Sequence, residues 1–497
     1  MFTYVIKIYN QFKNLYNIKK HIDCIYTIKD INNEEKNNKL FKSLKDIIFK
    51  SGSLYIKFLQ WYISKLKANI INNNNPDTII TIKFINYFED IFEQCPYHSL
   101  EHTKTIFKEV MYGIELEDYI DISTFKTIAS GSIGQVYYGK RKRDGVEVAI
   151  KVKHPTIDTD LENQYELLTV LRYIQSIHYF KVKYNLIFNI DDFLEDINLQ
   201  CDFNNEANNV KTFIENFKDS EKYIIFPKIL FQSNDLLISE YIEGESIESL
   251  SDMAKFKTSL NFICFFKQML FIDNFIHGDL HCKNWKVKYN KDTKITQMII
   301  YDCGICFQNS NIKLSTDFWF ALINYDIDNL IIVLKEFLKI NNNLNIPYFT
   351  LKKFDEEVTY IFRNIIDNNN HMGTSLIMNI LLDIFRNNNL IINKFLLNFT
   401  IFICVIEDYM KSNNLISKTI NKNITMFDVI NDSQFDIIAF CETNKCYTKV
   451  CDLIKLKSKD NFKVYKNNNK LNNFENNEKK KLFSSIELST LTFKPPE

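Results

Sequence analysis

Apolar residues recur at helical spacing along the first 120 positions of the chain. The spacing is clearest in four segments, 40–49, 54–66, 79–92 and 100–112. Apolar residues three and four positions apart share one face of a helix, and a glycine flanked by serines, as in Ser51-Gly52-Ser53, is typical of a break between helices. The pattern therefore predicts a helical N-terminal extension over residues 1–120.

The apolar period shortens to that of β-strands near Ile120. Alternation of apolar and polar residues predicts strands at 125–129, 134–140, 147–152, 223–226 and 236–240. Arg143-Asp144-Gly145 supplies a turn between the second and third strands, and helical patterns at 161–180 and 190–217 interrupt the series. We therefore expect a small β-rich lobe over residues 121–243 that contains a helical insertion.

Helical patterns dominate the rest of the chain and surround one predicted β-hairpin. The helices are expected at 246–275, 316–338, 354–366, 376–385 and 390–411, and the hairpin strands at 285–289 and 295–301. From about residue 457 the chain is rich in Asn and Lys, which predicts a disordered tail over 457–497. The whole pattern indicates an α+β protein with a helical lobe over 244–456.

Composition excludes several classes of function. Lys plus Arg and Asp plus Glu are equal at 61 each, so net charge favours neither nucleic acid nor an anionic membrane as a partner. Eleven cysteines without paired spacing, and no secretory signal peptide, predict reduced thiols in an intracellular, non-secreted protein. Cys303 and Cys306 have the CxxC spacing of a zinc site, but no second pair accompanies them, so structural thiols are favoured.

Hydrophobicity predicts no transmembrane segment, because no run approaches the ~20 consecutive apolar residues that a membrane helix requires. Residues 1–20 are apolar and carry Lys but no Arg, so we favour the cytoplasm and leave a mitochondrial location open. Heavy use of Asn, Ile, Lys, Phe and Tyr, with only 10 Gly and 7 Pro, indicates an AT-rich genome.

Two short polar motifs stand on either side of the predicted hairpin. An H-x-D-x-x-x-x-N sequence runs from His277 through Asp279 to Asn284, and a D-x-G sequence follows at 302–304. Phosphoryl transfer of the protein-kinase type needs one carboxylate that faces the acceptor hydroxyl, and an Asn and a second carboxylate that hold magnesium. Asp279, Asn284 and Asp302 have the order and spacing for these roles.

A glycine-rich turn and a strand lysine precede these motifs. Residues 129–136 fit the phosphate-binding loop G-x-G-x-x-G-x-V except that Ala replaces the first Gly. Glycines allow backbone N–H groups to approach phosphates closely. Lys151 ends the sequence Val148-Ala149-Ile150-Lys151, and a lysine within a strand is costly to bury unless it pairs with phosphates and a carboxylate. The residues expected to bind ATP here are Ala129, Ser130, Gly131, Ser132, Ile133, Gly134, Val136 and Lys151.

Three further observations bear on the nucleotide site and its substrate. Glu206 is the best candidate to pair with Lys151 because of its place between strands, although most helix carboxylates are only solvated. Residues 238–244 resemble the hinge between two kinase lobes, in which Glu240 and Ile242 would offer backbone groups to adenine. After Gly304 only about a dozen residues precede the next helical pattern, and no A-P-E sequence occurs, so an ordinary docking platform for a protein substrate is absent from the sequence.

These ordered motifs resemble the UbiB family of atypical protein-kinase-like proteins, also called the aarF-domain or ubiquinone-biosynthesis kinase family. The resemblance covers roughly residues 50–340 and rests on the nucleotide loop at 128–136, Lys151 followed by His154-Pro155, the E-x-D and E-A elements at 200–207, H-x-D-x-H-x-x-N at 277–284 and D-F-G at 302–304. It implies a two-lobed protein-kinase-like fold with a small β-rich N-lobe, a helical C-lobe and an N-terminal helical extension.

The extension carries Lys57-Phe58-Leu59-Gln60, which resembles the K-x-G-Q signature of the family. In the family this element folds over the site where a protein substrate would bind, so the resemblance implies regulatory roles for Lys57 and Gln60. Leu59 and Gln200 replace Gly and Glu of the family pattern and weaken the case for such closure. Gly131 replaces Ala and favours ordinary nucleotide binding, and Cys303 replaces the Phe of D-F-G.

The resemblance implies an ATP-binding kinase or ATPase that uses Mg2+, with Asp279 as the catalytic residue. The acceptor stays open among water, a small molecule, a protein and a lipid-like molecule such as a quinone precursor, and peripheral contact with a membrane stays open with it. A choline- or aminoglycoside-type small-molecule kinase is one alternative, because those enzymes share H-G-D-L-H-x-x-N and because Gly278 and Leu280 fit them. A non-catalytic nucleotide-binding scaffold is the other.

Overall fold

The computed structural model describes residues 2–26, 33–69, 76–92, 94–155, 157–162, 190–280, 283–293, 295–308, 312–323, 326–341, 346–367 and 374–388, together with 170, 172, 173, 390 and 396. Most of the helix predicted at 161–180 and nearly all of the one predicted at 390–411 lie outside these residues, as does the predicted tail over 457–497. His281 of the H-x-D-x-H-x-x-N motif also lies outside them.

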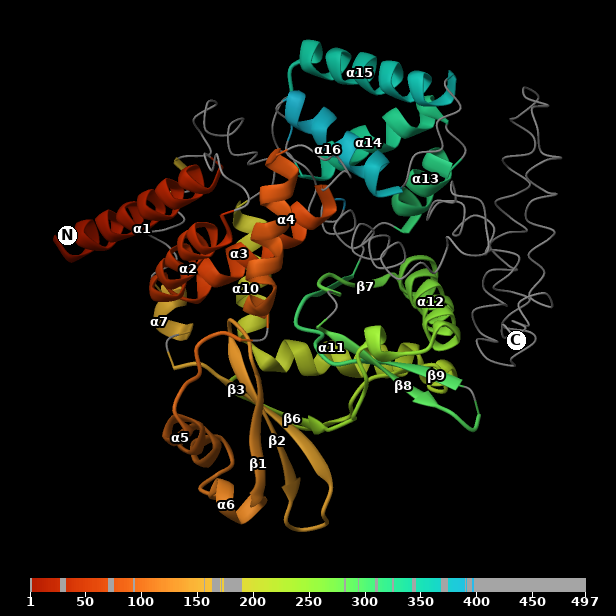
Figure 1. The fold of residues 1–497 in the computed structure, drawn as a ribbon. Coiled ribbons are helices and arrows are strands. Elements are labelled where there is room, and N and C mark those ends of the chain that lie inside the picture. Colours follow the sequence, from red (N-terminus) through yellow and green to blue (C-terminus); the bar gives the residue numbers. More distant parts are fainter. Residues whose placement is uncertain are drawn as a thin grey trace.

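Helices form the N-terminal extension, as the apolar pattern predicts (Figure 1). They are α1 (Phe2–Tyr26), α2 (Glu34–Ser51), α3 (Ser53–Asn69) and α4 (Pro76–Phe88), followed by a 3-10 turn, η1 (Glu89–Phe92). The predicted break is confirmed at Gly52, whose φ of 106° is a conformation that glycine adopts without strain. Phe41, Phe84 and Phe88 are buried together between α2 and α4, with ring centroids 4.6 to 6.3 Å apart.

A five-stranded antiparallel sheet forms the β-rich lobe. Its strands are β1 (Ile120–Ser130), β2 (Gly134–Arg141), β3 (Glu147–Lys153), β5 (Ile229–Gln232) and β6 (Leu236–Glu240), in the order β1-β2-β3-β6-β5. Two helices, α5 (Leu100–Val110) and α6 (Leu116–Tyr119), precede β1, and Phe107 of α5 shares an apolar cluster with Val152 and Ile238 of the sheet. Four of the five strands predicted from alternation are confirmed in this sheet, the one predicted at 223–226 belongs to another sheet, and β5 is an additional edge strand.

Two helices of the insertion lead from β3 towards the second lobe. They are α10 (Ile190–Cys201) and α11 (Phe203–Asn216), with the short α7 (Ile157–Glu162) before them and η2 (Lys218–Ser220) after them. The single helix predicted at 190–217 is wrong in one respect, because Asp202 interrupts it. The Asp202 carboxylate accepts a hydrogen bond of 3.0 Å from the backbone N–H of Asn204 and so caps α11, which places Glu206 in the first turn of that helix.

Helices and short strands form the second lobe. The helical elements are η3 (Ile247–Ser249), α12 (Asp252–Lys267), η4 (Gln268–Asp273), α13 (Ile312–Ile323), α14 (Ile327–Asn341), α15 (Tyr348–Asp367) and α16 (Thr374–Asn387). The strands are β4 (Ile224–Ile225), β8 (Trp285–Asn290) and β9 (Ile295–Ile300) in one sheet, and β7 (Phe275–His277) and β10 (Cys306–Gln308) in another. The predicted hairpin is confirmed as β8 and β9, with Trp285 opposite Ile300.

Three features of this lobe differ from expectation. The helix predicted at 316–338 is two helices, α13 and α14, and two boundaries have moved. The strand predicted at 223–226 is shorter, because only Ile224–Ile225 pair with β9. The helix predicted through 275 ends at Asp273, since Asn274 adopts a φ of 54° and turns the chain into β7. This turn sends His277 and Asp279 towards the β-rich lobe.

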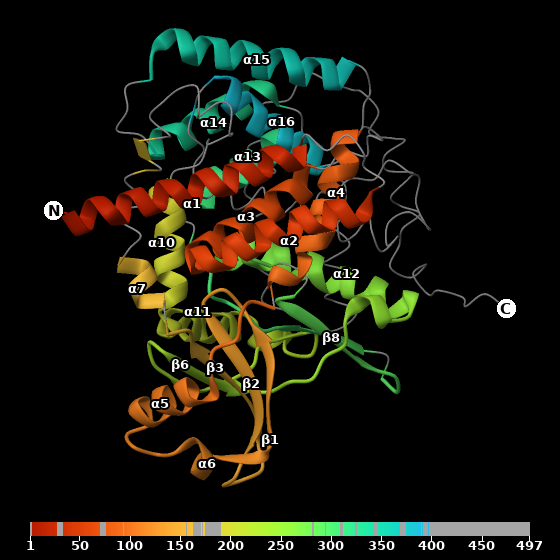
Figure 2. The same ribbon diagram turned by 60° about the vertical axis from the view of Figure 1, so that its left-hand side comes forward.

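The extension lies between the β-rich lobe and the C-terminal helices in both ribbon views (Figures 1 and 2). Its α3 packs against α16 on one side and α7 on another, so the extension is part of the folded body. None of the helices that the structure describes has both the length and the apolar character that spanning a bilayer requires.

Candidate active site

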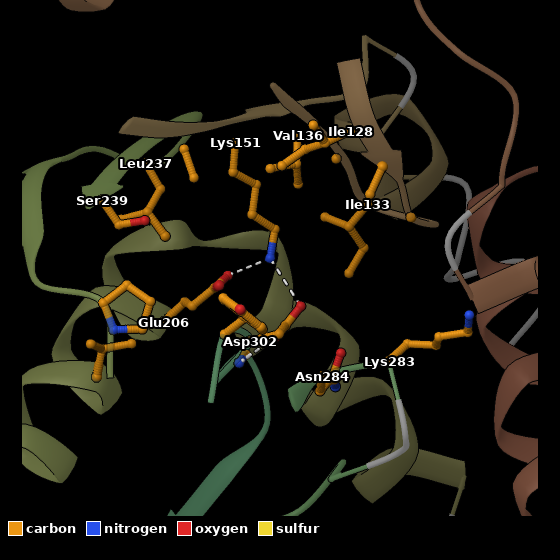
Figure 3. Close-up of a pocket in the computed structure, with 18 of the residues that line it drawn as sticks. Ile128, Ile133, Val136, Lys151, Glu206, Leu237, Ser239, Lys283, Asn284 and Asp302 are labelled. Carbon is orange, nitrogen blue, oxygen red and sulfur yellow. Dashed lines mark hydrogen bonds and ion pairs between the residues drawn. The ribbon is translucent and has the colours of Figure 1, made fainter. Parts of the chain in front are cut away.

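A cavity of about 370 Å³ lies between the β-rich lobe and the helical lobe (Figure 3). Strands β2, β3 and β6 with the turn before β2 border it on one side, the ends of β7, β8 and β9 border it on the other, and α3 of the extension contributes to its wall. Every residue predicted from the sequence to belong to the site lines this cavity, except Ser130. The volume is in the range of pockets that hold small molecules and cofactors.

The turn between β1 and β2 is a tight loop that faces the cavity. The backbone N–H of Gly131 donates a hydrogen bond of 2.9 Å to the carbonyl of Gly134. A Cβ on Gly134 would lie 2.9 Å from the Val152 carbonyl and 3.0 Å from the ring of Phe203, whereas a Cβ on Gly131 would come no closer than 3.7 Å to Gly134. Glycine is therefore required at 134, while 131 has room for the alanine that is usual in UbiB proteins.

Ser130 has a structural place beside this loop. Its hydroxyl donates to the Pro96 carbonyl at 3.3 Å, and its own carbonyl accepts a hydrogen bond of 2.8 Å from the N–H of Cys95. The residue is buried and fastens the loop to the segment that follows η1. The expectation that Ser130 lines a nucleotide site is thus not met by its position.

Lys151 is at the centre of a charged cluster that faces the cavity. Its Nζ lies 2.6 Å from Oε2 of Glu206 and 3.2 Å from Oδ2 of Asp302 (Figure 3). The lysine comes from β3, the glutamate from α11 and the aspartate from the end of β9, so three distant parts of the sequence meet here. The Glu206 side chain is only 4% exposed. Burying a carboxylate is costly unless a cation pairs with it, and Lys151 is that cation here.

Burial and ion pairing act in opposite directions on the pKa values of these three groups. Burial raises the pKa of Glu206 to about 7, against the opposing charge of Lys151. Burial alone would lower the pKa of Lys151, but the carboxylates of Asp302 and Glu206 more than offset this and raise it. Burial would likewise raise the pKa of Asp302, yet Lys151 and the N–H of Gly304 hold it well below its usual range. Asp302 is therefore ionised at neutral pH.

Asn284 and Asp279 are held together below this cluster. The side-chain amide N–H of Asn284 donates to the Asp279 carbonyl at 2.7 Å, which leaves the Asn284 oxygen to face Asp302 in Figure 3. His277 Nδ1 accepts the N–H of Asp279 at 3.2 Å, and Nε2 donates to the Asp302 carbonyl at 2.6 Å. The buried His277 thereby joins the two motifs. An amide oxygen and a carboxylate are hard oxygen donors, which is the donor set that suits Mg2+.

Two residues of the extension reach the site. Nζ of Lys57 lies 3.6 Å from Oδ2 of Asp279. Gln60 is buried, donates to the Ile91 carbonyl at 2.9 Å and accepts a hydrogen bond of 3.3 Å from the hydroxyl of Ser132 in the loop. The extension thus contacts both halves of the site although Leu59 and Gln200 depart from the family pattern.

The segment after β6 connects the lobes along the cavity. The N–H of Glu240 is bonded to the Lys228 carbonyl at 2.9 Å, and the Ile242 carbonyl accepts a hydrogen bond of 2.8 Å from the hydroxyl of Tyr301. Both residues line the cavity. A Cβ on Gly244 would lie within 3 Å of Lys286, Ile299 and Tyr301, so glycine allows the two lobes to approach here.

Sequence reasoning missed a chain of histidines behind the loop. Nδ1 of His98 and Nδ1 of His154 lie 2.8 Å apart, and Nε2 of His154 lies 3.0 Å from the carbonyl of Gly131. His98 also contacts the hydroxyl of Thr103 in α5 at 2.8 Å. His154 stands out in the sequence only as part of a family pattern, and no local pattern links it with His98, 56 positions away.

Gly278 has a packing explanation. A Cβ at this position would lie 2.8 Å from the side chain of Ile305 and 3.0 Å from the ring of Phe307. The backbone N–H of Gly278 donates to the Ile305 carbonyl at 2.8 Å, where the segment after β7 meets the segment before β10. The neighbouring side chains leave room only for glycine at position 278. Gly278 is therefore weaker evidence for a choline- or aminoglycoside-type kinase.

Comparison with known proteins identifies a kinase-like domain in this chain. The model of the ABC1 atypical kinase-like domain matches residues 90–334. A probable serine/threonine-protein kinase of Dictyostelium discoideum is 28% identical over 256 residues, which cover 49% of this chain and 34% of the relative. A mitochondrial ABC1 family protein of Saccharomyces cerevisiae is 28% identical over 231 residues, which cover 41% of this chain and 34% of that protein. The chain thus spans about a third of the length of these two relatives.

Among solved structures, the Rv3197–erythromycin complex from Mycobacterium tuberculosis is similar to this chain with a TM-score of 0.41 and 16% sequence identity. The alignment covers 69% of this chain and 87% of that structure. The two lobes are seen in the sheet, the hinge and the helices of this chain itself. The sequence similarity is seen in the match to the domain model and to the curated relatives. Residues 90–334 match the ABC1 atypical kinase-like domain, and relatives of the chain carry ABC1 and AarF-domain names, which confirms the resemblance to the UbiB family.

Proposed function

We propose that this protein binds ATP with Mg2+ in the cavity between its lobes and transfers the terminal phosphoryl group. The observation that carries the proposal is the cluster of Lys151, Glu206 and Asp302 under the glycine-rich turn. A buried lysine held by a helix glutamate on the phosphate side of such a cavity is the arrangement that kinases require. The match to the ABC1 atypical kinase-like domain supports the kinase-like part of this proposal.

Each group has a role that follows from its position. The turn at 131–134 offers backbone N–H groups to the phosphates, and Lys151 adds a positive charge that Glu206 orients. The backbone of Glu240 and Ile242, which lines the cavity, would face adenine. Asn284 and Asp302 would hold Mg2+, which supplies charge stabilisation for the transferring group when bound. Asp279 would orient the acceptor and take its proton.

Lys57 gives this site a closed form. Its ammonium group pairs with Asp279, the residue that an acceptor hydroxyl would have to reach. We propose that the extension must shift before an acceptor gains access, and that water or a small acceptor is favoured over a folded protein. The acceptor class proposed is a small or lipid-like molecule, a quinone precursor included. The choline-type alternative retains Leu280, which is buried here, as its remaining sequence support.

A non-catalytic scaffold is less well supported because the acceptor-facing carboxylate, the metal-binding pair and the strand lysine are all present and converge.

As for location, we propose an intracellular protein of the cytoplasm or the mitochondrion. The mitochondrial name of the yeast relative belongs to that protein, and imaging of a tagged full-length chain would separate the two compartments.

Turnover of ATP by the purified chain tests the proposal. Phosphate release and transfer of label to candidate acceptors should be measured separately for wild type, Lys151→Met and Asp279→Asn. Lys140→Met is the matched control, since Lys140 lies in the neighbouring strand and pairs with the exposed Glu147. Loss of turnover in the two site variants with activity kept in the control supports the proposal, and equal turnover in all four proteins refutes it.

A further inference from the structure

One thiol lies within the D-x-G motif at 302–304, and a second lies two positions after that motif. Cys303 is fully buried between Asp302 and Gly304, and Cys306 is partly exposed three positions later. The Cys306 thiol donates a hydrogen bond of 3.3 Å to the Cys303 carbonyl, so the two residues are in contact across the turn between them. A disulfide needs Cβ atoms about 4 Å apart, which a turn over an intervening glycine can provide.

The position of this pair links it to both catalytic motifs. Cys306 is the cross-strand partner of His277 in the β7–β10 ladder, and the next ladder contact, from Gly278 N–H to the Ile305 carbonyl, is 2.8 Å long. The Cys303 carbonyl also accepts a hydrogen bond of 2.8 Å from Asn209 in α11, the helix that carries Glu206. A bond between the two sulfurs would therefore act on the segment that positions Asp302 and on the strand that leads to Asp279.

We propose that Cys303 and Cys306 form a reversible disulfide that switches the site off under oxidising conditions. The oxidant is a hydroperoxide, which is small enough to reach the partly exposed Cys306. One thiol attacks the peroxide oxygen to give a sulfenic acid and an alcohol or water, and the other thiol attacks the sulfenic sulfur and expels water. The net reaction converts two thiols and one hydroperoxide into a disulfide, an alcohol and water; a dithiol reductant reverses it by exchange.

The consequence for the site follows from the hydrogen bonds. Closing the disulfide takes the Cys306 sulfur away from the Cys303 carbonyl and twists the peptide units between Asp302 and Gly304. The Asp302 carboxylate depends on the Gly304 N–H at 2.8 Å and on Lys151 for its position. We expect at least a tenfold weaker affinity for Mg-nucleotide in the oxidised protein, a part of the proposal that rests on the proposed function.

Peptide mapping tests the thiol pair directly. Trypsin releases residues 295–313 as one peptide, in which Cys303 and Cys306 are the only cysteines. After treatment of the full chain with hydrogen peroxide and blocking of remaining thiols, this peptide should lose two hydrogens in mass and regain them with dithiothreitol. The unmodified peptide after oxidation, or a cross-link from it to another peptide, overturns the proposal.

Two variants separate the switch from general oxidation. Cys306→Ser removes one sulfur outside the nucleotide site, so it should keep nucleotide affinity and lose the response to peroxide. Cys24→Ser removes an exposed thiol of the extension and should keep the response. A disulfide that forms without weakening Mg-nucleotide binding overturns the switch. If the reduced wild type binds no nucleotide, the proposed function fails, while the peptide mass still decides whether the pair is a disulfide site.

Discussion

Lys57 of the N-terminal extension lies 3.6 Å from Asp279, a residue 222 positions away in the sequence and at the centre of the candidate active site. The side chains are 15% and 28% exposed, so the ion pair is only partly screened by solvent. The carboxylate that we propose faces the acceptor is here paired with the protein's own lysine. The extension is therefore placed to limit access to the site.

Replacing Lys57 with Ala should raise ATP turnover. Partly exposed ion pairs contribute about 1 kcal/mol, which corresponds to about a fivefold change in rate if the pair must open before reaction. Lys45→Ala is the matched control, because it breaks the Lys45–Asp90 pair within the same extension without touching the cavity. Turnover that falls in Lys57→Ala, or that rises equally in both variants, would count against a specific closing role for Lys57.

The two glycines of the loop should respond differently to alanine. Gly134→Ala should lose about 1–3 kcal/mol of stability and most of its nucleotide affinity, because the added methyl meets the Val152 backbone and Phe203. Gly131→Ala has room for its methyl and should retain both properties. Denaturant unfolding and nucleotide titration of the two variants provide the measurement, and equal behaviour of the pair would contradict the loop geometry.

Acidification should weaken the β-rich lobe through its histidines. Burial lowers the pKa of His98 to about 3, aided by His154 and His102, and burial also lowers the pKa of His154. In the unfolded chain histidine has a pKa near ~6.5, so the unfolded state binds more protons than the folded state as pH falls below that value. Stability is therefore fully present above about pH 6.5 and decreases towards pH 5.

The measurement for this pH effect is the melting temperature of wild type and His98→Gln at pH 7.5 and pH 5.5. Gln can still hydrogen-bond to Thr103 but does not titrate, so its melting temperature should fall less on acidification. Carboxylates such as Glu206 titrate in both proteins and cancel in the comparison. A steeper decrease in the variant than in wild type would be the opposite of what the buried histidine pair requires.

Gly278→Ala should destabilise the protein by about 1–3 kcal/mol, because the new methyl meets Ile305 and Phe307. Removing part of the obstacle with Ile305→Ala in the same protein should recover some of that loss relative to the sum of the single changes. A double-mutant cycle of unfolding free energies measures this coupling. Additive losses would show that the two side chains do not compete for the same space.

The nucleotide half of the site could be predicted from sequence because its parts are local motifs. The loop at 129–136 and the Lys151 strand form one hairpin system. Asn284 precedes the first strand of another hairpin and Asp302 follows its second strand, so both lie at its open end. The pairing of neighbouring strands in a hairpin can be predicted from sequence alone, and it positions these residues without knowledge of any tertiary contact. The pairing of Glu206 with Lys151 was predictable only by its place in the order of elements, since nothing local distinguishes it from a solvated glutamate.

Contacts between distant, weakly patterned segments were beyond sequence reasoning. Strands β5 and β10 are short edge strands. Their residues show too little apolar alternation to predict a strand, and pairing with β6 and β7 stabilises them. The contact between His98 and His154 joins two segments with no shared period. Asp202 shows the reverse case, since a helix that looks continuous in its apolar pattern is divided by a side chain that caps the next turn.

Binding of nucleotide with and without magnesium is the most direct test of the account. Calorimetric titration of ATP into wild type and Asp302→Asn, each with Mg2+ and with a chelator, measures whether the cavity holds a metal–nucleotide pair. We expect one site in wild type whose affinity rises at least tenfold with Mg2+, and no such gain in Asp302→Asn. An affinity in wild type that is unchanged by Mg2+, or a full magnesium gain in the variant, would contradict the central claim.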